Sequence, residues 1–530
     1  MEKLKYLIIL ATFLQVCSSY KILVVYPLPG KSHNILGQAT VKHLLNAGHE
    51  VTYVTPFPTS KTTDKYHEVD LSKNLDNYQT NDDLFNLKTI LDKSGNQQML
   101  TMLPNMIKML KMNLDNDNLK KFLGDTTQSF DLVIAEWLFS DAYAGFATVF
   151  DCPLIWFAST EPHWMVLQLV HETSNPAFNP SIMSTSSPPF SFVERAGSLV
   201  GMFLFSALRY FYISPAEKTV YEEYFAPFLQ IRGRPLPNYE EVLYNGSMLL
   251  TNSHSSLGQP VSVPPNTKEI SGYHIDPNTK PLPADLQKLM DESKHGVIYF
   301  SMGSNAKSKD FPDELKRDIL KMFGTLKQTV LWKFEEQLQN LPKNVQILKW
   351  APQHSILAHL NLRVFITHGG LLSTTETVFF GVPAVVIPYG LDQHLNAERA
   401  VNKGFALKVD LSYEMAGPMK LAITRLTAQN RYTERVKELS QMYHDRPVAP
   451  GAELVHWVEH VVRTRGAPHL RSPALLLPWY QKMYLDLLAV VLLALYVVKL
   501  ILKKLCDIAK NVLRNLGLVK SPVKKQKKTN

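Results

Sequence analysis

The residues with the clearest chemical potential lie between positions 350 and 393. Residues 364–367 form a short apolar, β-branched run that ends at His368 and the pair Gly369-Gly370, and a helical pattern follows over 371–380. Glycines allow the backbone to approach a ligand closely, and the free N–H groups and dipole of a helix start favour an anion. His368 adds a donor beside this turn. The stretch therefore predicts a site for a phosphate-bearing ligand.

Flanking side chains could complete a nucleotide site. Trp350 offers a flat face for a base, and Glu376 lies one turn into the predicted helix, where its carboxylate could hold ribose hydroxyls. A purely structural interpretation also exists, because Ser373-Thr-Thr-Glu376 is a capping box and a glycine pair after a strand is often only a turn. The order and combination of these features favour the ligand site.

A second candidate group lies in the first half of the chain. His33 follows the apolar strand 21–26, and Glu136 follows the apolar strand 130–135. Ligands of open α/β sheets bind at such carboxyl ends of strands. A histidine with a near-neutral pKa suits proton abstraction, and a carboxylate can orient it and stabilise the imidazolium. Alternatively, His33 is only a polar residue beside a helix cap, and Glu136 is only a surface carboxylate. If Glu136 is not the partner of His33, Asp141 is the substitute.

The elements around these residues predict an α/β fold. The segment 21–55 has the pattern strand, helix, strand. In the second half, strands alternate with helices, which predicts a parallel sheet covered on both faces. The expected strands are 296–301, 329–334, 345–349, 364–367, 384–387 and 406–409, and the expected helices include 312–326, 353–359, 371–380 and 393–403. A chain of 530 residues exceeds one hydrophobic core, so two main domains are expected.

Both ends of the chain indicate a membrane protein. Residues 1–19 have a basic start, a short apolar run and small residues, which is typical of a signal peptide. Residues 484–502 are apolar and just long enough to cross a thin bilayer, with the basic tail 503–530 in the cytosol and the body in the lumen. For 198–213 we considered a wall of a binding pocket, a membrane-touching helix and a buried core helix.

Charge and cysteine content exclude several classes. The net charge is +9, but residues 499–530 carry ten Lys or Arg against one Asp, so the body is close to neutral and no nucleic-acid partner is expected. The chain has 3 cysteines, with only Cys152 in the body. No cluster has metal-ligand spacing, so no metal is predicted. Asn245-Gly-Ser is a glycosylation sequon.

The motifs Trp350-Ala-Pro-Gln353, His368-Gly-Gly370 with Ser373 and Glu376, and Asp392-Gln393 together resemble the signature of the UDP-glycosyltransferase family. The resemblance covers nearly the whole chain, in the membrane-anchored, insect-type form. It implies two Rossmann-like domains facing each other across a cleft (the GT-B arrangement) and a C-terminal transmembrane helix. The implied reaction is inverting transfer of a hexose from a UDP-sugar to a hydroxyl of a small lipophilic acceptor, of the detoxification type.

The resemblance implies a role for each matching residue. His33 would be the catalytic base and Glu136, where many members have Asp, its partner. Trp350 would stack on the base of the donor, and Gln353 would bond its edge. The diphosphate would be bound by Ser304, His368, Gly370 and Ser373. Glu376 would bind the ribose, and Asp392 and Gln393 would bind the sugar. Leu372 stands where many members have Asn, as in the insect branch.

The family comparison also favours a donor sugar. Members that use glucuronic acid commonly have Arg where this chain has Thr251, so UDP-glucose is predicted, without a resident cofactor or metal. The final Lys527-Lys528-Thr-Asn resembles a retrieval signal for the endoplasmic reticulum, although a generic basic tail is the alternative. A homo-oligomer is left open. The rival functions are a catalytically silent carrier or receptor of lipophiles and a sugar-nucleotide epimerase.

The predicted domain boundaries follow from these motifs and from the Pro-rich stretch before residue 286. They are a signal peptide (1–19), an acceptor-binding domain (20–257), a linker (258–285), a donor-binding domain (286–445), a return helix with a pre-membrane segment (446–483), a transmembrane helix (484–502) and a basic tail (503–530).

Overall fold

The computed structural model describes residues 19–79, 86–92, 95–137, 139–170 and 174–518. It divides into two compact units, Met1–Arg471 and Ser472–Asn530, which are described separately. Nearly all of the predicted signal peptide, and the predicted retrieval signal at the C-terminus, lie outside the described residues.

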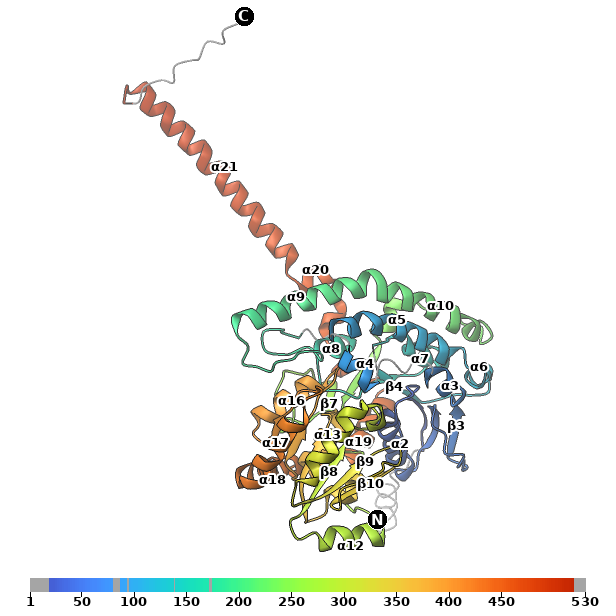
Figure 1. The fold of residues 1–530 in the computed structure, drawn as a ribbon. Coiled ribbons are helices and arrows are strands. Elements are labelled where there is room, and N and C mark those ends of the chain that lie inside the picture. Colours follow the sequence, from blue (N-terminus) through green and yellow to red (C-terminus); the bar gives the residue numbers. More distant parts are fainter. Residues whose placement is uncertain (1–18, 80–85, 93–94, 138, 171–173, 519–530) are drawn as a thin grey trace, which may run out of the picture. The chain divides into compact units, whose positions relative to one another are not determined.

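The first half of the body is built on a seven-stranded parallel sheet in the order β3-β2-β1-β4-β5-β6-β7 (Figure 1). Side chains of β1 alternate between two apolar clusters, Ile22 and Val24 on one face and Leu23 and Val25 on the other, so both faces are covered. The strands are β1 (Lys21–Val25), β2 (Glu50–Thr55), β3 (Tyr66–Asp70), β4 (Leu132–Trp137), β5 (Leu154–Ala158), β6 (Gly246–Thr251) and β7 (Thr267–Glu269).

Three of these strands, β3, β6 and β7, were not expected. β3 lies in a polar region, and its alternating burial is that of an edge strand, which shows a weak apolar pattern. β7 lies inside the predicted linker and pairs with β6 at the opposite edge.

The helices of the first half lie mainly on one face of the sheet, opposite α2. They are α2 (Lys31–Asn46), α3 (Lys73–Gln79), α4 (Leu87–Asp92), α5 (Gly95–Leu114), α6 (Asp117–Gly124), α7 (Gly145–Phe150), α8 (Trp164–Leu167), α9 (Phe192–Leu208), α10 (Ser214–Gln230) and α11 (Tyr239–Leu243), with the short turns η2 (Ala142–Ala144), η3 (Gln168–Val170) and the π-helical η4 (Arg209–Ile213). α4 packs instead on the second half, because Leu87 belongs to the apolar cluster around Phe300 and Trp332.

The second half is a six-stranded parallel sheet in the order β10-β9-β8-β11-β12-β13. Its strands are β8 (Val297–Ser301), β9 (Thr329–Lys333), β10 (Val345–Leu348), β11 (Leu362–Thr367), β12 (Ala384–Val386) and β13 (Ala406–Lys408). Its helices are α12 (Ala284–Glu292), η5 (Ser308–Asp310), α13 (Asp313–Gly324), α14 (Gln353–Leu357), α15 (Leu371–Phe379), α16 (Gln393–Asn402), α17 (Ala416–Ala428) and α18 (Asn430–His444). The alternation predicted from sequence is confirmed here, with both faces covered by helices.

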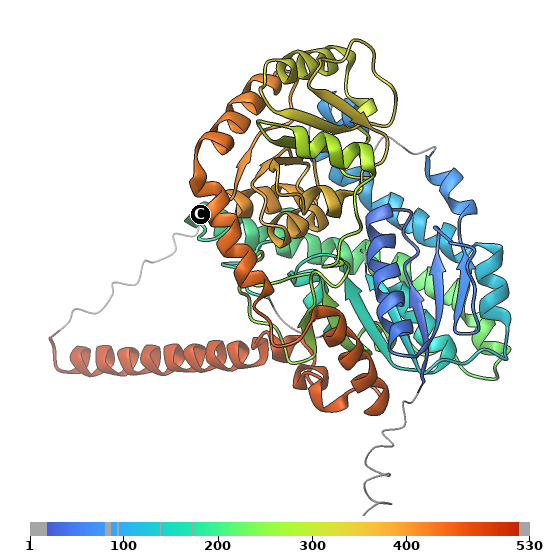
Figure 2. The same ribbon diagram turned by 90° about the horizontal axis from the view of Figure 1, so that it is seen from below.

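The chain then returns to the first half, in the orange and red part of Figure 2. α19 (Pro450–Arg463) packs against α2, and Leu454, Val458 and Val461 are fully buried among residues of the first sheet. The turn η6 (Pro468–Leu470) follows. The first sheet is therefore completed by residues from the end of the body.

The second unit contains η7 (Pro473–Leu476), α20 (Trp479–Lys482) and the long helix α21 (Leu485–Asn515). α21 is long and apolar enough to cross a membrane, with a mean hydropathy of 2.6 in its most apolar window. The helix extends beyond the predicted span 484–502 and includes the first part of the predicted basic tail.

Residues 198–213, for which a pocket wall, a membrane-touching helix and a buried core helix were the alternatives, lie in α9 and η4. Neither element has a buried residue, so the buried core helix is wrong for this segment.

Candidate active site

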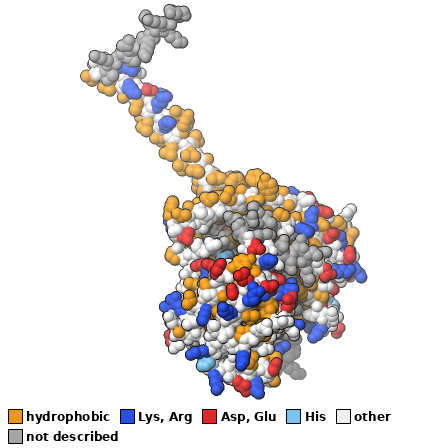
Figure 3. Space-filling view, in the orientation of Figure 1, with side chains coloured by type: hydrophobic (Ala, Val, Ile, Leu, Met, Phe, Trp, Pro, Cys, Tyr) orange, Lys and Arg blue, Asp and Glu red, His pale blue; other side chains and the backbone are white. Residues whose placement is uncertain are grey.

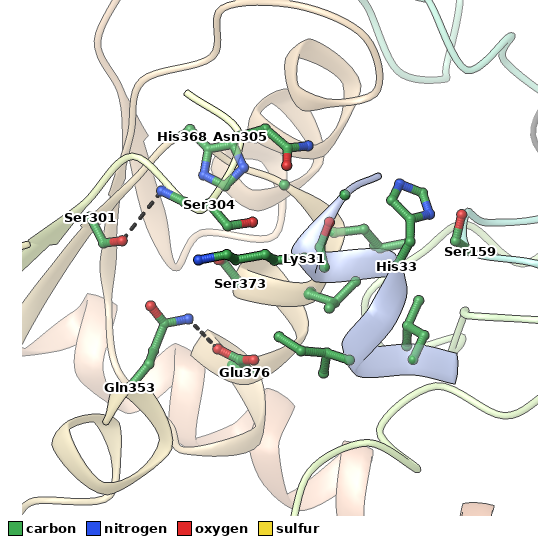
Figure 4. Close-up of a pocket in the computed structure, with 18 of the residues that line it drawn as sticks. Lys31, His33, Ser159, Ser301, Ser304, Asn305, Gln353, His368, Ser373 and Glu376 are labelled. Carbon is green, nitrogen blue, oxygen red and sulfur yellow. Dashed lines mark hydrogen bonds between the residues drawn. The ribbon is translucent and has the colours of Figure 1, made fainter. Parts of the chain in front are cut away.

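One cavity of about 850 Å³ is lined by His33 and by all the residues predicted to bind the donor; Glu136 is not among the described residues that line it. It is lined by the loops at the carboxyl ends of the strands in both sheets, as expected for open parallel sheets. His33 lies on the side of the first sheet, whereas Ser304, Gln353, His368, Ser373 and Glu376 lie on the side of the second (Figure 4).

His33 and Glu136 form a direct pair. His33 lies in the first turn of α2 and Glu136 in β4, with 2.5 Å between His33 Nδ1 and Glu136 Oε1. Glu136 is only 1% exposed, and its Oε2 has no hydrogen-bond partner in the described part of the chain. Gly30 is needed for this geometry, because a Cβ there would lie 2.8 Å from His33 Cδ2. Because Nδ1 of His33 contacts Glu136, its other ring nitrogen, Nε2, is the atom that can accept a proton from a ligand.

The surroundings of His33 set its basicity. Burial lowers the pKa of His33, but the charge and hydrogen bond of Glu136 outweigh burial, and Asp392 adds to the effect, so the pKa is raised. Asp392 belongs to the second sheet's side, and burial raises the pKa of its carboxyl. Asn396 donates to Asp392 Oδ2 at 2.8 Å and to Gly369 O at 2.9 Å, which fixes that loop. A carboxylate of the second half, Asp392, therefore lies close enough to raise the pKa of His33 in the first half.

The substitute partner Asp141 lies elsewhere. Its Oδ1 accepts from Trp137 Nε1 at 2.7 Å, and its carboxylate forms an ion pair with Arg209. Asp141 is therefore occupied in a buried ion pair, and Glu136 is the carboxylate that contacts His33.

The predicted phosphate turn has the expected local structure. β11 ends at Thr367, and α15 begins at Leu371, directly after Gly370. Gly303 has φ +84°, and a Cβ there would lie 2.5 Å from His368 Cε1, so a glycine is required for His368 to fit. Burial, followed by the charge of Lys333, lowers the pKa of His368 to about 4. The neutral ring stacks on Tyr389 with centroids 5.7 Å apart, and it can donate a hydrogen bond to an anion without carrying a charge.

Positive charge reaches this turn from both sheets. Lys333 Nζ donates to Gly303 O at 2.6 Å and pairs with Glu335 at 3.1 Å. Lys31, at the first position of α2, extends across the cavity toward Ser304 and Ser373 (Figure 4). Its Nζ lies 5.1 Å from the centre of the Trp350 ring. Because Lys333 already has a carboxylate partner, Lys31 is the more available cation.

Sequence reasoning missed Lys31. The stretch Pro29-Gly-Lys-Ser was visible, but its spacing does not fit a phosphate loop, and nothing local shows that this lysine faces residues more than 300 positions away.

Glu376 is the centre of a polar cluster at the far end of the turn. Gln353 Nε2 donates to Glu376 Oε2, His354 Nε2 lies 3.0 Å from Oε1, and Tyr299 donates to Gln353 Oε1 at 3.1 Å. Burial raises the pKa of Glu376, but His354 and His274 outweigh burial, so the pKa is lowered and the carboxylate stays charged. Trp350 leaves 62% of its surface exposed beside this cluster. A planar base and a pair of ribose hydroxyls fit these partners.

The remaining donor-side predictions are placed as follows. Gln393, the first residue of α16, lines the cavity but is 4% exposed, and its Oε1 accepts from Tyr389 N at 2.9 Å. Only its Nε2 is left for a ligand. Leu372 packs against the apolar cluster of the first sheet, so an apolar side chain there serves a contact across the cleft.

Thr251, the position at which members that use glucuronic acid commonly have Arg, lies away from the cavity. It is fully buried at the end of β6, and its hydroxyl lies 2.9 Å from Ser253 Oγ and donates to Lys268 O. It does not line the cavity among the described residues. A direct contact between residue 251 and a sugar is therefore not seen.

The other end of the cavity is apolar. It is lined by side chains from separate loops and helices of the first half, namely Phe57, Leu75, Met106, Met109, Phe139, Ile182 and Met183. No residue of α9 or η4 is among the described residues that line it, so that segment is not the wall of this pocket.

Comparison with known proteins identifies the family. A family model described as UDP-glucoronosyl and UDP-glucosyl transferase matches residues 21–518. The chain belongs to this family. This UDP-glycosyltransferase is similar to UDP-glucosyltransferase 2 of Dactylopius coccus, with 34% identity over 509 residues that cover 94% of this chain and 96% of the relative. It is also similar to human UDP-glucuronosyltransferase 2B7, with 29% identity over 393 residues that cover 73% and 72%.

Solved structures give the same fold. The UDP-glycosyltransferase resembles the spinosyn forosaminyltransferase SpnP, with a TM-score of 0.54 and 17% identity over 84% of this chain and 100% of that one. It also resembles a UDP-glucosyltransferase from Polygonum tinctorium, with a TM-score of 0.53 and 16% identity over 84% and 99%. The predicted GT-B arrangement, the family and the glycosyltransferase activity are confirmed; the roles of individual residues stay predictions.

Proposed function

We propose that this UDP-glycosyltransferase transfers glucose from UDP-glucose, with inversion, to a hydroxyl of a small lipophilic acceptor, as a conjugation that removes foreign or waste compounds. The observation that carries the proposal is the His33–Glu136 contact, because His33 lines the same cavity as the phosphate turn and its polar cluster. A carrier of lipophiles would need the apolar end of the cavity but neither the base nor the donor site.

The chemistry follows from the positions of the atoms. His33 Nε2 takes the proton of the acceptor hydroxyl, and Glu136 stabilises the imidazolium. The acceptor oxygen forms a bond to C1 of the sugar while the bond from C1 to the β-phosphate oxygen breaks, and UDP leaves with that electron pair. Attack from the face opposite UDP inverts C1, so an α-linked donor gives a β-glucoside.

The donor is held by the second sheet's side of the cavity. Trp350 stacks on uracil, Gln353 bonds its edge and Glu376 holds the ribose. The diphosphate meets the N-terminal amides of α15 at Gly370 and Ser373, the neutral His368 and Ser304. We assign the balancing charge to Lys31, which moves from Trp350 to the diphosphate when uracil takes its place on the ring.

This arrangement supplies charge stabilisation from the chain itself. In the part of the chain that the structure describes, no group of three or more His, Cys, Asp or Glu residues is arranged to hold a metal ion. We propose that the α15 amides and Lys31 balance the charge of the diphosphate, and that the enzyme has no resident cofactor.

Glucose is proposed as the sugar because of the charges near C1. Asp392 and Gln393 would bond the sugar hydroxyls, and the carboxylates of Asp392 and Glu136 both act on the field around His33. A glucuronate carboxylate would add a further negative charge beside these two carboxylates, which is unfavourable.

The protein's location is part of the proposal. We propose that α21 spans the membrane of the endoplasmic reticulum once, with the body in the lumen and the basic tail in the cytosol. Asn245 is exposed, as a glycosylation site requires, and its Oδ1 accepts from Arg471 at 2.9 Å.

The test is UDP release by membranes that contain the full chain, with UDP-glucose or UDP-glucuronic acid and a panel of simple phenols. We expect acceptor-dependent release that is faster with UDP-glucose and is lost in His33→Ala but kept in His67→Ala, a surface histidine outside the cavity. Faster turnover with UDP-glucuronic acid would overturn the choice of sugar. No release with either donor from a folded protein would favour the carrier.

A further inference from the structure

α9 and η4 present a continuous apolar surface to the outside of the body. We call the outward side chains of residues 192–212 the α9 face. Its large members are 43–76% exposed: Phe192, Val193, Leu199, Val200, Phe203, Leu204, Tyr210, Phe211 and Tyr212. Hydrophobic side chains gather over α9 along the upper edge of the body (Figure 3). Monomeric soluble proteins rarely expose so many large apolar side chains in one place, so this face indicates a binding surface.

The opposite side of the same helix is fixed to the body. Met202 and Phe205 pack against the core of the first sheet, and Phe205 meets Trp164 edge to face, with centroids 5.3 Å apart. The orientation of α9 is thus determined by packing. The α9 face cannot turn inward, and the helix cannot cross a bilayer without leaving the body's core.

The charges of this segment also point inward. Arg209 is the one charged residue between positions 196 and 212, and it forms an ion pair with Asp141, which is 1% exposed. In the following helix, α10, Glu217 is buried. Its carboxylate accepts hydrogen bonds from Asp141 N at 3.1 Å and from the Tyr239 hydroxyl at 3.2 Å. Because Arg209 is paired in this way, the outer side of residues 196–212 carries no charge over more than four helical turns.

We propose that the α9 face lies in the surface layer of a lipid bilayer, parallel to the membrane. The occupant is lipid because this chain carries its own candidate membrane helix, α21, which would hold the body beside a bilayer, and because the combined helix Phe192–Gln230 itself reaches a hydropathy of 1.4 in its most apolar window with no buried residue there. Tyr210 and Tyr212 suit the interface, where an aromatic ring can be apolar at one end and hydrated at the other.

The composition also predicts the kind of lipid contact. The outer side of α9 has no lysine and only Arg195 near its start. Binding through this face therefore depends on apolar area and is insensitive to the charge of the headgroups. A surface of phosphatidylcholine, whose headgroup has no net charge, is therefore sufficient for binding.

Site-specific fluorescence in the full chain tests the proposal. In a background with Cys17→Ser and Cys506→Ser, Phe203→Cys or Phe211→Cys carries an environment-sensitive label, and Leu360→Cys, a position 95% exposed, is the matched control. Cys152 stays unlabelled at neutral pH, because burial raises the pKa of its thiol to about 12. The labelled protein is reconstituted in phosphatidylcholine vesicles with and without nitroxide lipids, and retained UDP release shows that it is folded.

We expect a blue-shifted emission at positions 203 and 211, and quenching by shallow nitroxide lipids roughly three-fold stronger than at 360. Exchange of phosphatidylcholine for an anionic lipid should leave these values unchanged. Equal lipid quenching at all three positions would overturn the proposal. Protection that rises with protein density without lipid quenching would also overturn it, and would assign the face to a second copy of the chain.

Discussion

The two walls of the cavity are built in different ways. On the donor side, most of the proposed contacts come from the continuous stretch 350–393, and their polar side chains already bond one another, as Glu376 does with Gln353 and His354. On the acceptor side, the apolar lining comes from separate segments between Phe57 and Met183. The base belongs to the acceptor side, yet its field includes Asp392 from the donor side. Nucleotide binding is therefore local in sequence, whereas acceptor choice and proton transfer depend on how distant segments meet.

The largest expected effect is on proton transfer. His33→Ala should lower kcat by about 100- to 10,000-fold, because the general base is removed. The KM for UDP-glucose should stay within a factor of about two, because no donor contact is lost. Steady-state kinetics with His67→Ala as the control measure both values. A large rise in donor KM with kcat unchanged would place His33 on the donor side of the cavity instead.

Glu136→Gln should lower kcat by roughly 10- to 100-fold, because a charged hydrogen bond to the imidazolium is lost. Glu136 raises the pKa of His33, and the base works only when neutral, so activity falls as the pH drops through that pKa. Without the carboxylate the pKa of His33 falls, and the acidic limb of the kcat/KM profile moves to lower pH. A limb that stays in place would show that His33 is not the titrating group.

Lys31→Gln should raise the KM for UDP-glucose by about 5- to 30-fold, as expected for loss of a charged contact to the diphosphate. Lys31→Arg should recover most of the binding. Titration of UDP itself by calorimetry provides a measure independent of turnover, and Lys65→Gln, on the surface, is the control. If UDP binds equally well to Lys31→Gln, Lys31 does not contact the diphosphate.

The smallest effect is expected at the apolar end. Met183→Ala should raise the KM of a bulky phenol by about 3- to 10-fold, through lost apolar contact, and leave the donor KM unchanged. Measuring KM for phenols of increasing size in the wild type and the variant shows whether the effect grows with acceptor size. A matching rise in donor KM would mean that the two walls do not act separately.

The features that are local in sequence were predictable, and those that depend on distant contacts were not. The strand, glycine turn and helix around His368 are local, so their structure was predictable, and β1 and β4 carry apolar runs that place His33 and Glu136 at neighbouring strand ends. The edge strands β3 and β7 were missed because an edge strand is half exposed and short. The buried strand β6 was missed because its apolar run, residues 248–250, is only three residues long. The reach of Lys31 to Trp350, and the packing of α4 on the second sheet, depend on how the two halves face each other.

The return of α19 to the first sheet has a consequence for how the protein is made. Leu454, Val458 and Val461 complete the apolar face that contains Ile22 and Val24, so the amino-terminal domain lacks part of its core until nearly the whole body has been synthesised. Domains generally fold as they emerge from the ribosome. In this chain the first domain to emerge must wait for the second, and a fragment that ends at the linker would expose an apolar surface to chaperones.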